Sequence, residues 1–306
     1  MLLIDGVSQQ ASGRQTYDII SPSSGNVIGR AAAADATDVH RAVINAQETF
    51  FRWSQRTAYE REAIVRQATQ HVRTRAEEIG RLMALEQGKP WKQSTSEVLS
   101  ACDLMDFYAA EGPRIEGTIH PTEKPNYHSW VIHQPVGGCA AITPWNYPVA
   151  LLSWKIGPAL AAGCTVVVKP TPITSLCVSA FCLALVEGGL PAGVVNVITG
   201  PDAALGQALV EHPHIAKVAM TGSTKVGKRI LESCAPTLKR VSVELGGHCP
   251  AIVCADTDLD LAAQVIAYKG FRNGGQSCSS VNRVFVHESA HDALAERLVA
   301  QAEAMT

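Results

Sequence analysis

The chain contains 306 residues, of which 46% are hydrophobic and 18% charged, and its formal net charge is -2. This composition is typical of a soluble globular protein with one large domain or two, and it gives no reason to expect nucleic acid or an anionic membrane as a partner. The first residues resemble no signal peptide, and no uncharged apolar run is long enough to cross a membrane.

The cysteines indicate the cellular compartment. There are nine, an odd number, and they are scattered along the chain without a Cys-x-x-Cys pair. This pattern argues against a disulfide framework and against a zinc site, and it favours a reducing compartment. We therefore expect a cytoplasmic protein without a bound metal.

The first third of the chain is expected to form strands and then helices. Residues 1–35 have strand and turn patterns, with a strong turn signal at 21–26. Apolar residues then recur at helical spacing, with stop signals at Gly88 and at Gly112-Pro113. The expected helices are one that starts at Thr37-Asp38, a second at 56–87 and a third at 91–110. Residues 113–135 then alternate between two prolines, which predicts a β-hairpin on the outside of the body.

From Gly137 onward, strand and helix patterns alternate. An unbroken apolar run such as 165–169 suits a parallel strand that is buried on both faces. The repeats predict an α/β fold with a doubly wound, mostly parallel sheet. The expected strands are 139–142, 165–169, 194–198, 217–220 and 241–244, and the expected helices are 152–162, 174–187, 203–211 and 228–235.

A second, smaller α/β unit is expected after Glu244. Either Asp256 or Thr257 would cap its first helix. The expected elements are a strand at 250–254, a helix at 256–273, a strand at 283–287 and a helix at 289–305.

A glycine turn at 221–227 leads from a strand into a helix and contains Gly222, Ser223 and Gly227. Free backbone N–H groups and the helix dipole at such a helix start attract a phosphate. Because the spacing differs from Gly-x-Gly-x-x-Gly, an ordinary helix cap is the alternative interpretation.

Cys278 lies in a polar loop between a helix pattern and a strand pattern, directly after a glycine pair. Burial alone would place a cysteine in an apolar run, as with Cys164. A cysteine in such a loop is either a nucleophile or a structural residue.

Two further segments carry groups that suit a nucleophile. Glu244 ends a β-branched run just before Gly246-Gly247, so it is either a solvated residue at a strand end or a general base. Asn146 lies between Pro144 and Pro148, so it is either a turn residue or an oxyanion donor held in a stiff loop.

The order of the segments 144–148, 244–247 and 275–278 strongly resembles the NAD(P)-dependent aldehyde dehydrogenase superfamily, and the resemblance runs from about Ile20 to the last residue. It implies a dinucleotide-binding domain formed by 1–112 and 136–244, an oligomerisation hairpin at 113–135, and the first part of a catalytic domain at 245–306. A plain surface hairpin remains the alternative for 113–135.

The resemblance implies roles for the three candidate residues. Cys278 matches the nucleophile, Glu244 the general base, and Asn146 an oxyanion donor that acts together with the backbone N–H of Cys278. The implied reaction oxidises a small-molecule aldehyde to a carboxylic acid through a thiohemiacetal and a thioacyl intermediate on the cysteine. An acylating dehydrogenase that releases acyl-CoA is the rival enzyme, and Glu244 argues against it because such members generally lack the base.

The resemblance also implies a site for NAD or NADP. Lys169 and Pro172 match positions that contact the adenosine ribose, and members that prefer NAD often have a glutamate in place of Pro172. Neither cofactor is therefore favoured. The other implied cofactor residues are Ile142, Thr143, Pro144, Trp145, Gly222, Ser223, Val226, Gly227 and Leu245.

The segments 157–164 and 271–273 resemble the succinate-semialdehyde branch of the family. In that branch two arginines bind the distal carboxylate of the substrate. One matches Arg272, whereas the position of the other holds Trp154. Losing such a partner costs about 1.5–3 kcal/mol, so we expect relaxed specificity.

The family's second domain continues well beyond the last residue of this sequence. We therefore expect a truncated chain, poorly soluble and weakly active by itself, whose full-length form is a homo-oligomer. A catalytically impaired remnant that only binds dinucleotide or partner subunits is the non-enzyme alternative.

Overall fold

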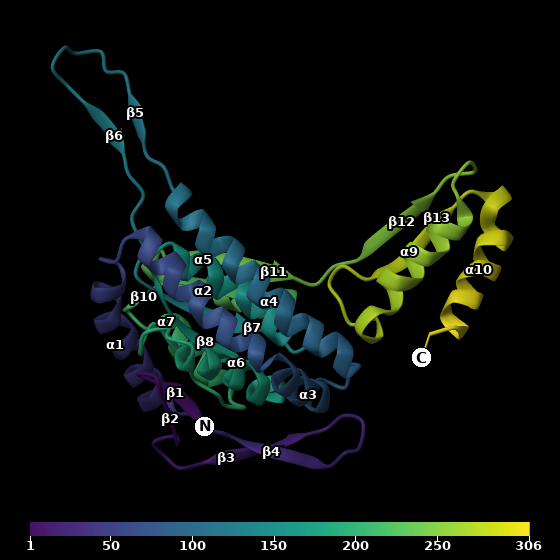
Figure 1. Ribbon diagram of the computed structural model, residues 1–306, viewed down its shortest axis with the longest axis horizontal. Coiled ribbons are helices and arrows are strands. Elements are labelled where there is room, and N and C mark those ends of the chain that lie inside the picture. The colour runs from purple at the N-terminus through teal and green to yellow at the C-terminus, as the bar shows by residue number, and fades with distance from the viewer. Residues whose placement is uncertain (306) are drawn as a thin grey trace. The chain divides into compact units, whose positions relative to one another are not determined.

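A computed structural model describes residues 1–305 of the protein and divides the chain into two units, Met1–Glu244 and Leu245–Thr306 (Figure 1). Each unit has its own hydrophobic core. The two units are described separately below.

The first unit is built on a seven-stranded sheet. Its strands are β1 (Leu2–Ile4), β2 (Val7–Gln9), β7 (Gly138–Thr143), β8 (Thr165–Pro170), β9 (Val195–Val197), β10 (Ile215–Gly222) and β11 (Arg240–Leu245). They lie in the order β11-β10-β7-β8-β9-β1-β2. The four strands from β10 to β9 are parallel to one another, and β1 pairs antiparallel with β9 and β2. The prediction of an α/β fold with a mostly parallel sheet is confirmed.

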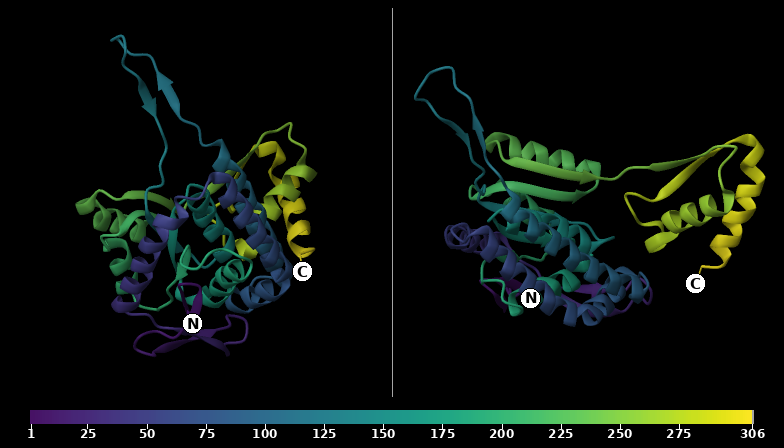
Figure 2. Two further views of the ribbon diagram at one scale, coloured as in Figure 1. Left: turned by 60° about the vertical axis from the view of Figure 1, so that its left-hand side comes forward. Right: turned by 45° about the horizontal axis from the view of Figure 1, so that its top comes forward.

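Helices cover both faces of this sheet (Figure 2). They are α1 (Ala36–Trp53), α2 (Ala58–Thr74), α3 (Ala76–Gln87), α4 (Trp91–Glu111), α5 (Pro148–Ala161), α6 (Ser175–Glu187), α7 (Ala203–Glu211) and α8 (Thr224–Cys234). The crossover helices α5 and α6 lie on one face. The return to β10 places α7 and α8 on the other face, where α7 also packs on α1, because such crossovers are right-handed. α2, α3 and α4 form a second helical layer outside α5 and α6.

The first strand of the chain lies between β9 and the edge strand β2. Leu2, Leu3 and Ile4 of β1 are all less than 5% exposed. Leu3 lies opposite Val197 of β9. The apolar start of the chain is therefore part of the core of the first unit.

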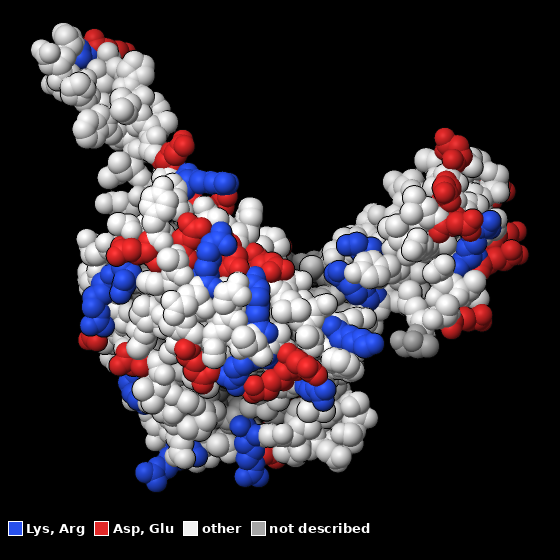
Figure 3. Space-filling model, in the orientation of Figure 1, with Lys and Arg blue, Asp and Glu red and all other residues white. Residues whose placement is uncertain are grey.

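Two antiparallel hairpins extend from the first unit. β3 (Thr16–Ile20) pairs with β4 (Val27–Ala32), and β5 (Thr118–His120) pairs with β6 (Ser129–Val131). The β5–β6 hairpin protrudes, as predicted, and most of its visible surface carries no charge (Figure 3). Its most exposed apolar side chains are Ile119, Tyr127, Trp130 and Ile132.

The structure corrects the predicted helix starts and lengths near the N-terminus. α1 begins one residue before Thr37 because Asp35 is its cap and accepts hydrogen bonds from the N–H groups of Thr37 and Asp38. The single helix predicted at 56–87 is two helices, since Arg75 leaves helical geometry and pairs with Glu187 of α6.

Further corrections concern helix starts in the parallel repeats. α5 begins at Pro148 rather than at Leu152, because proline is tolerated in the first turn of a helix. α8 begins at Thr224 rather than at Lys228, and Ser223 is its cap.

The second unit contains a parallel strand pair and two helices. These are β12 (Cys249–Val253), α9 (Leu259–Phe271), β13 (Val281–Val286) and α10 (His291–Glu303). Val253, Ala263, Ile266 and Leu294 form its core. The predicted caps Asp256 and Thr257 are wrong, because Asp258 accepts hydrogen bonds from the first turn of α9.

No helix in the part of the chain that the structure describes is long and apolar enough to span a membrane. The same residues, 1–305, contain no cluster of three or more histidine, cysteine or acidic side chains placed to hold a metal ion.

Glu86, near the end of α3, caps the start of α6. Its two carboxylate oxygens accept hydrogen bonds from the backbone N–H groups of Leu176 and Cys177, both at 2.7 Å. Those N–H groups belong to the first turn of α6, where no partner exists within the helix. Burial raises the pKa of Glu86 to about 7.

Replacing Glu86 with glutamine should flatten the dependence of stability on pH. Since the folded-state pKa of about 7 lies above the ordinary 4.5, the stability that this proton provides is present below pH 4.5 and is lost as the pH rises through 7. Between these two pH values, the unfolding free energy of the wild type should fall by roughly 3 kcal/mol more than that of Glu86→Gln. Urea unfolding across this range measures the difference, with Glu232→Gln at an exposed position as the control. Parallel profiles for Glu86→Gln and the wild type would contradict the assignment.

Candidate active site

Three parallel strands of the first unit end side by side where the order of the sheet reverses. β7 lies between β8 and β10, and its Ile142 is in register with both Lys169 and Met220. The chain runs outward from β7 through β8 to β9 and then returns to β10 on the other side of β7. Open α/β sheets bind their ligands outside the carboxyl ends of the strands at such a switch point.

The groups at this point fit the phosphates of a dinucleotide. β10 ends at Gly222, and the Ser223 side chain caps α8 by accepting a hydrogen bond from the N–H of Val226 at 3.4 Å. The start of α8 therefore offers N–H groups and the positive end of a helix dipole. The hydroxyl of Thr143, at the end of β7, is buried and has no hydrogen-bond partner among residues 1–305. A buried hydroxyl without a partner is costly, so this group is available to hydrogen-bond a polar ligand.

The remaining predicted cofactor residues surround the same strand ends, except one. Lys169 is buried, and burial lowers its pKa, an effect that the charge of Asp202 opposes. Pro172 starts the short 3-10 helix that follows β8. Leu245 is the last residue of β11 and the first residue of the second unit. The others are half-buried Ile142 and Pro144, exposed Trp145 and Val226, and buried Gly227.

A buried ion pair holds the segment that carries Asn146. Lys89 Nζ donates a hydrogen bond to the backbone carbonyl of Asn146 at 3.0 Å and forms an ion pair with Glu97 of α4. Glu97 Oε1 accepts hydrogen bonds from the N–H groups of Val149 and Ala150 at 3.1 and 3.0 Å. These N–H groups form the first turn of α5, so one carboxylate fixes both the loop and the helix start.

Sequence reasoning missed this pair, although a signal for it exists. The Lys89 and Glu97 side chains are only 1% and 3% exposed. Glu97 lies at helical spacing with the buried residues Ala101 and Met105 of α4. A charged residue in an apolar helical stripe requires a partner, and this requirement points to a buried network.

Glu244 lies near the end of β11 and is exposed. Its negative charge acts on Lys155 of α5, whose Nζ donates hydrogen bonds to Thr221 Oγ1 at 2.6 Å and to the Leu151 carbonyl at 3.1 Å. Burial lowers the pKa of Lys155 to about 8, and the charge of Glu244 opposes this shift. Sequence reasoning also missed Lys155. The signal for it is a single cation within the largely apolar helix α5.

Cys278 lies in an exposed turn of the second unit. Asn273, Gly274 and Gly275 precede it in left-handed geometry, with φ values of 56°, 65° and 75°. The turn around Cys278 is closed by a hydrogen bond from the N–H of Ser280 to the carbonyl of Ser277 at 3.1 Å.

The exposure of the cysteines agrees with the contrast expected between Cys164 and Cys278. Cys164 is buried, as are five others, whereas Cys254 and Cys278 are exposed and Cys249 is half-buried. Exposure alone therefore does not distinguish Cys278 from Cys254.

The two predicted substrate residues lie in different units. The Arg272 guanidinium of the second unit lies over the ring of Tyr268, 5.7 Å from its centre. Trp154 of α5 is 55% exposed and meets the ring of Tyr108 edge-on, with 6.2 Å between ring centres.

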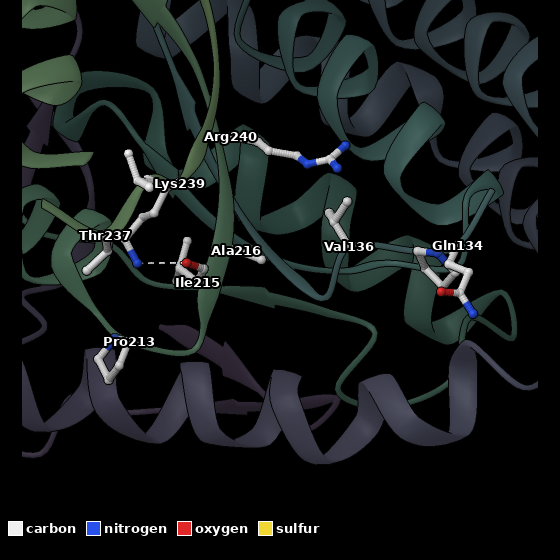
Figure 4. Close-up of a pocket in the computed structure, with 10 residues that line it drawn as sticks. Gln134, Val136, Pro213, Ile215, Ala216, Thr237, Lys239 and Arg240 are labelled. Carbon is white, nitrogen blue, oxygen red and sulfur yellow. Dashed lines mark hydrogen bonds between the residues drawn. The ribbon is translucent and has the colours of Figure 1, made fainter. Parts of the chain in front are cut away.

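A pocket of about 490 Å³ in the first unit lies apart from these residues (Figure 4). Gln134 and Arg240 line it, and Lys239 spans one side by donating a hydrogen bond to the Ile215 carbonyl at 2.7 Å. None of the predicted site residues contributes to its walls, so it is separate from the strand ends described above.

Comparison with known proteins identifies the family. The model of the aldehyde dehydrogenase family matches residues 8–306. The chain belongs to this family. It is 40% identical to the mitochondrial succinate-semialdehyde dehydrogenase of Arabidopsis thaliana over 294 residues, and 39% identical to the NADP(+) succinate-semialdehyde dehydrogenase of Escherichia coli over 296 residues.

A solved structure agrees with this assignment. The crystal structure of PnpE in complex with nicotinamide adenine dinucleotide superposes with a TM-score of 0.95 at 37% identity. The three matches cover 96%, 97% and 100% of this chain. The chain in turn spans 56%, 61% and 63% of the length of these proteins.

Breaking the buried Lys89–Glu97 ion pair should destabilise the first unit much more than breaking an exposed ion pair. Lys89→Met leaves the Glu97 carboxylate buried without its cation, and such a loss costs about 3–5 kcal/mol. Arg66→Met removes the exposed partner of Glu62 one helical turn away, and its cost should stay below about 1 kcal/mol. Urea unfolding of the two variants measures both effects. Similar losses would show that the Lys89–Glu97 pair has no special role.

Proposed function

We propose that this protein oxidises an aldehyde to a carboxylic acid with NAD+ or NADP+ as the electron acceptor. The observation that carries the proposal is the exposed thiol of Cys278, at the position where a chain of this family is expected to hold its nucleophile. The strand ends with the unpartnered Thr143 hydroxyl and the start of α8 support the dinucleotide part of the proposal.

In this proposal Cys278 Sγ adds to the carbonyl carbon of the aldehyde and forms the carbon–sulfur bond of a thiohemiacetal. The Asn146 amide and the Cys278 N–H donate hydrogen bonds to the oxygen that becomes negative. A bound dinucleotide would supply the acceptor for the hydride that leaves the thiohemiacetal carbon, and the loss of this hydride converts the thiohemiacetal on Cys278 into a thioester. Glu244 then takes a proton from the water that attacks the thioester, which releases the carboxylate and restores the thiol.

The contacts of the first unit support these roles. The Lys89–Glu97 pair holds the backbone of Asn146, so a fixed loop carries the proposed oxyanion donor. Lys155 places a positive charge close to Glu244 without forming an ion pair with it among the described contacts. The carboxylate thus stays exposed, as a base that acts on water requires.

The proposal includes both NAD+ and NADP+ as alternative electron acceptors. One relative is named for NADP(+), and one solved relative holds nicotinamide adenine dinucleotide. Pro172 offers neither a carboxylate for a 2′-hydroxyl nor a negative charge to repel a 2′-phosphate. For the same reason, a change at this position should alter cofactor preference.

The substrate class follows from Arg272 and Trp154. Two relatives are named for succinate semialdehyde, an aldehyde with a distal carboxylate. Arg272 keeps one cation for such a carboxylate, and the indole of Trp154 replaces the second with an apolar surface. We propose that succinate semialdehyde is no better a substrate than a neutral aldehyde of similar size.

Cys278→Ala should abolish aldehyde-dependent formation of NAD(P)H, because no other group replaces the thiol, while dinucleotide binding in a thermal-shift assay should remain. Cys254→Ala, which removes the other exposed cysteine, should keep wild-type activity. Glu244→Gln should slow turnover and allow acyl-enzyme to accumulate. If the wild type binds dinucleotide but oxidises no aldehyde, the protein is a binding remnant and the proposal is wrong.

Substrate preference should shift when the missing cation is restored. Trp154→Arg supplies a second guanidinium, and a bidentate partner is worth about 1.5–3 kcal/mol, so kcat/KM for succinate semialdehyde relative to pentanal should rise about tenfold to a hundredfold. Trp154→Leu is the control, since it removes the indole without adding charge. A wild-type protein that already prefers succinate semialdehyde by such a factor would contradict this prediction.

A further inference from the structure

The second unit brings two of its three cysteines together. The thiol of Cys249 donates a weak hydrogen bond to the backbone carbonyl of Cys278, with a sulfur–oxygen distance of 3.5 Å. Cys249 is half-buried and Cys278 is exposed. The contact therefore joins a second thiol to the residue whose own side chain carries the proposed nucleophile.

Strand pairing produces this contact. Cys249 is the first residue of β12 and is in register with Val281, the first residue of β13. The turn closed by Ser277 and Ser280 folds the chain back directly before β13. Cys278 is thereby held beside the start of β12, although 29 residues separate the two cysteines in the sequence.

We propose that Cys249 is a resolving thiol that forms a reversible disulfide with Cys278. The oxidant is a peroxide. The Cys278 thiolate attacks one peroxide oxygen, the O–O bond breaks, and Cys278 becomes a sulfenic acid while hydroxide leaves. The sulfur of Cys249 then attacks the sulfenic sulfur, the S–O bond breaks, and water leaves with the proton of the Cys249 thiol. The two sulfur atoms together lose two electrons, and the peroxide gains them.

The geometry places the two cysteines next to each other for the second step. A disulfide needs Cα atoms about 4.4–6.8 Å apart. Cys278 lies three residues before Val281, which is the strand partner of Cys249. The 3.5 Å contact already joins the sulfur of Cys249 to the backbone of Cys278. In this proposal, rotation about the two Cα–Cβ bonds and rearrangement of the exposed turn that carries Cys278 bring the sulfur atoms together.

No other cysteine offers the same reach. The residues after Cys278 are Ser279 and Ser280, so the loop itself contains no second thiol. Cys254 follows the far end of β12, five residues from Cys249, which is about 16 Å along an extended strand. The six remaining cysteines are buried in the first unit.

The consequence for catalysis rests on the proposed function, because a disulfide at Cys278 blocks an aldehyde only if Cys278 is the nucleophile. The chemical proposal itself does not depend on it. A disulfide also prevents further oxidation of Cys278 to the sulfinic acid, which is not reduced by thiols. The pair thus provides reversible inactivation in place of permanent loss.

The test treats the reduced 306-residue chain with hydrogen peroxide, blocks the remaining free thiols with iodoacetamide, and maps the peptides by mass spectrometry without reduction. The wild type should yield a peptide that joins Cys249 to Cys278 and disappears with dithiothreitol. Cys249→Ser should yield no such peptide and about tenfold more sulfinic acid at Cys278. Cys254→Ser is the matched control and should behave as the wild type.

Circular dichroism establishes that each variant is folded, and Cys249→Ala replaces Cys249→Ser if the serine disturbs β12. Equal amounts of sulfinic acid at Cys278 in the wild type and the Cys249 variant, without a joined peptide, would overturn the proposal. A joined peptide in a protein that oxidises no aldehyde would support the disulfide and refute the proposed function instead. Aldehyde oxidation without a joined peptide would support the proposed function and refute the disulfide.

Discussion

Two buried glutamates connect the outer helical layer of the first unit to the helix starts beneath it. Glu86 accepts hydrogen bonds from the second and third N–H groups of α6, and Glu97 does the same for α5. Neither helix has a side-chain cap of its own. These carboxylates replace the missing caps and place negative charge at the positive end of each helix dipole.

The position of these two caps matters because α5 and α6 follow β7 and β8, whose carboxyl ends carry Thr143 and Lys169. The candidate dinucleotide site therefore depends on charged groups from α3 and α4 that do not belong to it. Lys89 neutralises Glu97 and also holds the carbonyl of Asn146. Glu86 has no such cation among its described contacts. Burial therefore raises its pKa, and the hydrogen bonds from the N–H groups of Leu176 and Cys177 only partly oppose this shift.

Much of the fold was predictable because the strands of a covered parallel sheet are unbroken apolar runs, as in β8, where every residue is buried. Helix limits were less predictable. Nothing in the sequence around Arg75 breaks the helical pattern, and the break between α2 and α3 accompanies an ion pair with Glu187, more than a hundred residues away. Local patterns do not contain such contacts.

The candidate site also has a part that the sequence predicts and a part that it does not. Cys278, Glu244 and Asn146 stand in short segments with distinctive neighbours, so the sequence predicts them as a set. Their supporting residues lie elsewhere in the chain, and distant contacts alone define them. Lys155 meets Glu244 through the packing of α5 on the sheet, and Cys249 meets Cys278 through strand register. A single sequence gives no information on which distant residues become neighbours.

The position of β1 in the sheet has a consequence for how the protein is made. β1 pairs with β2 on one side and with β9 on the other, so Leu3 must wait until Val197 has been synthesised before these two residues can pair. During that interval the apolar residues Leu2, Leu3 and Ile4 can pair only with the nearby strand β2, although they are nearly fully buried in the end. Pairing across so long a separation closes a large loop, which slows folding and prolongs the exposure of apolar surface. The residues of β1 thus reach their full set of native contacts only after most of the first unit has been synthesised.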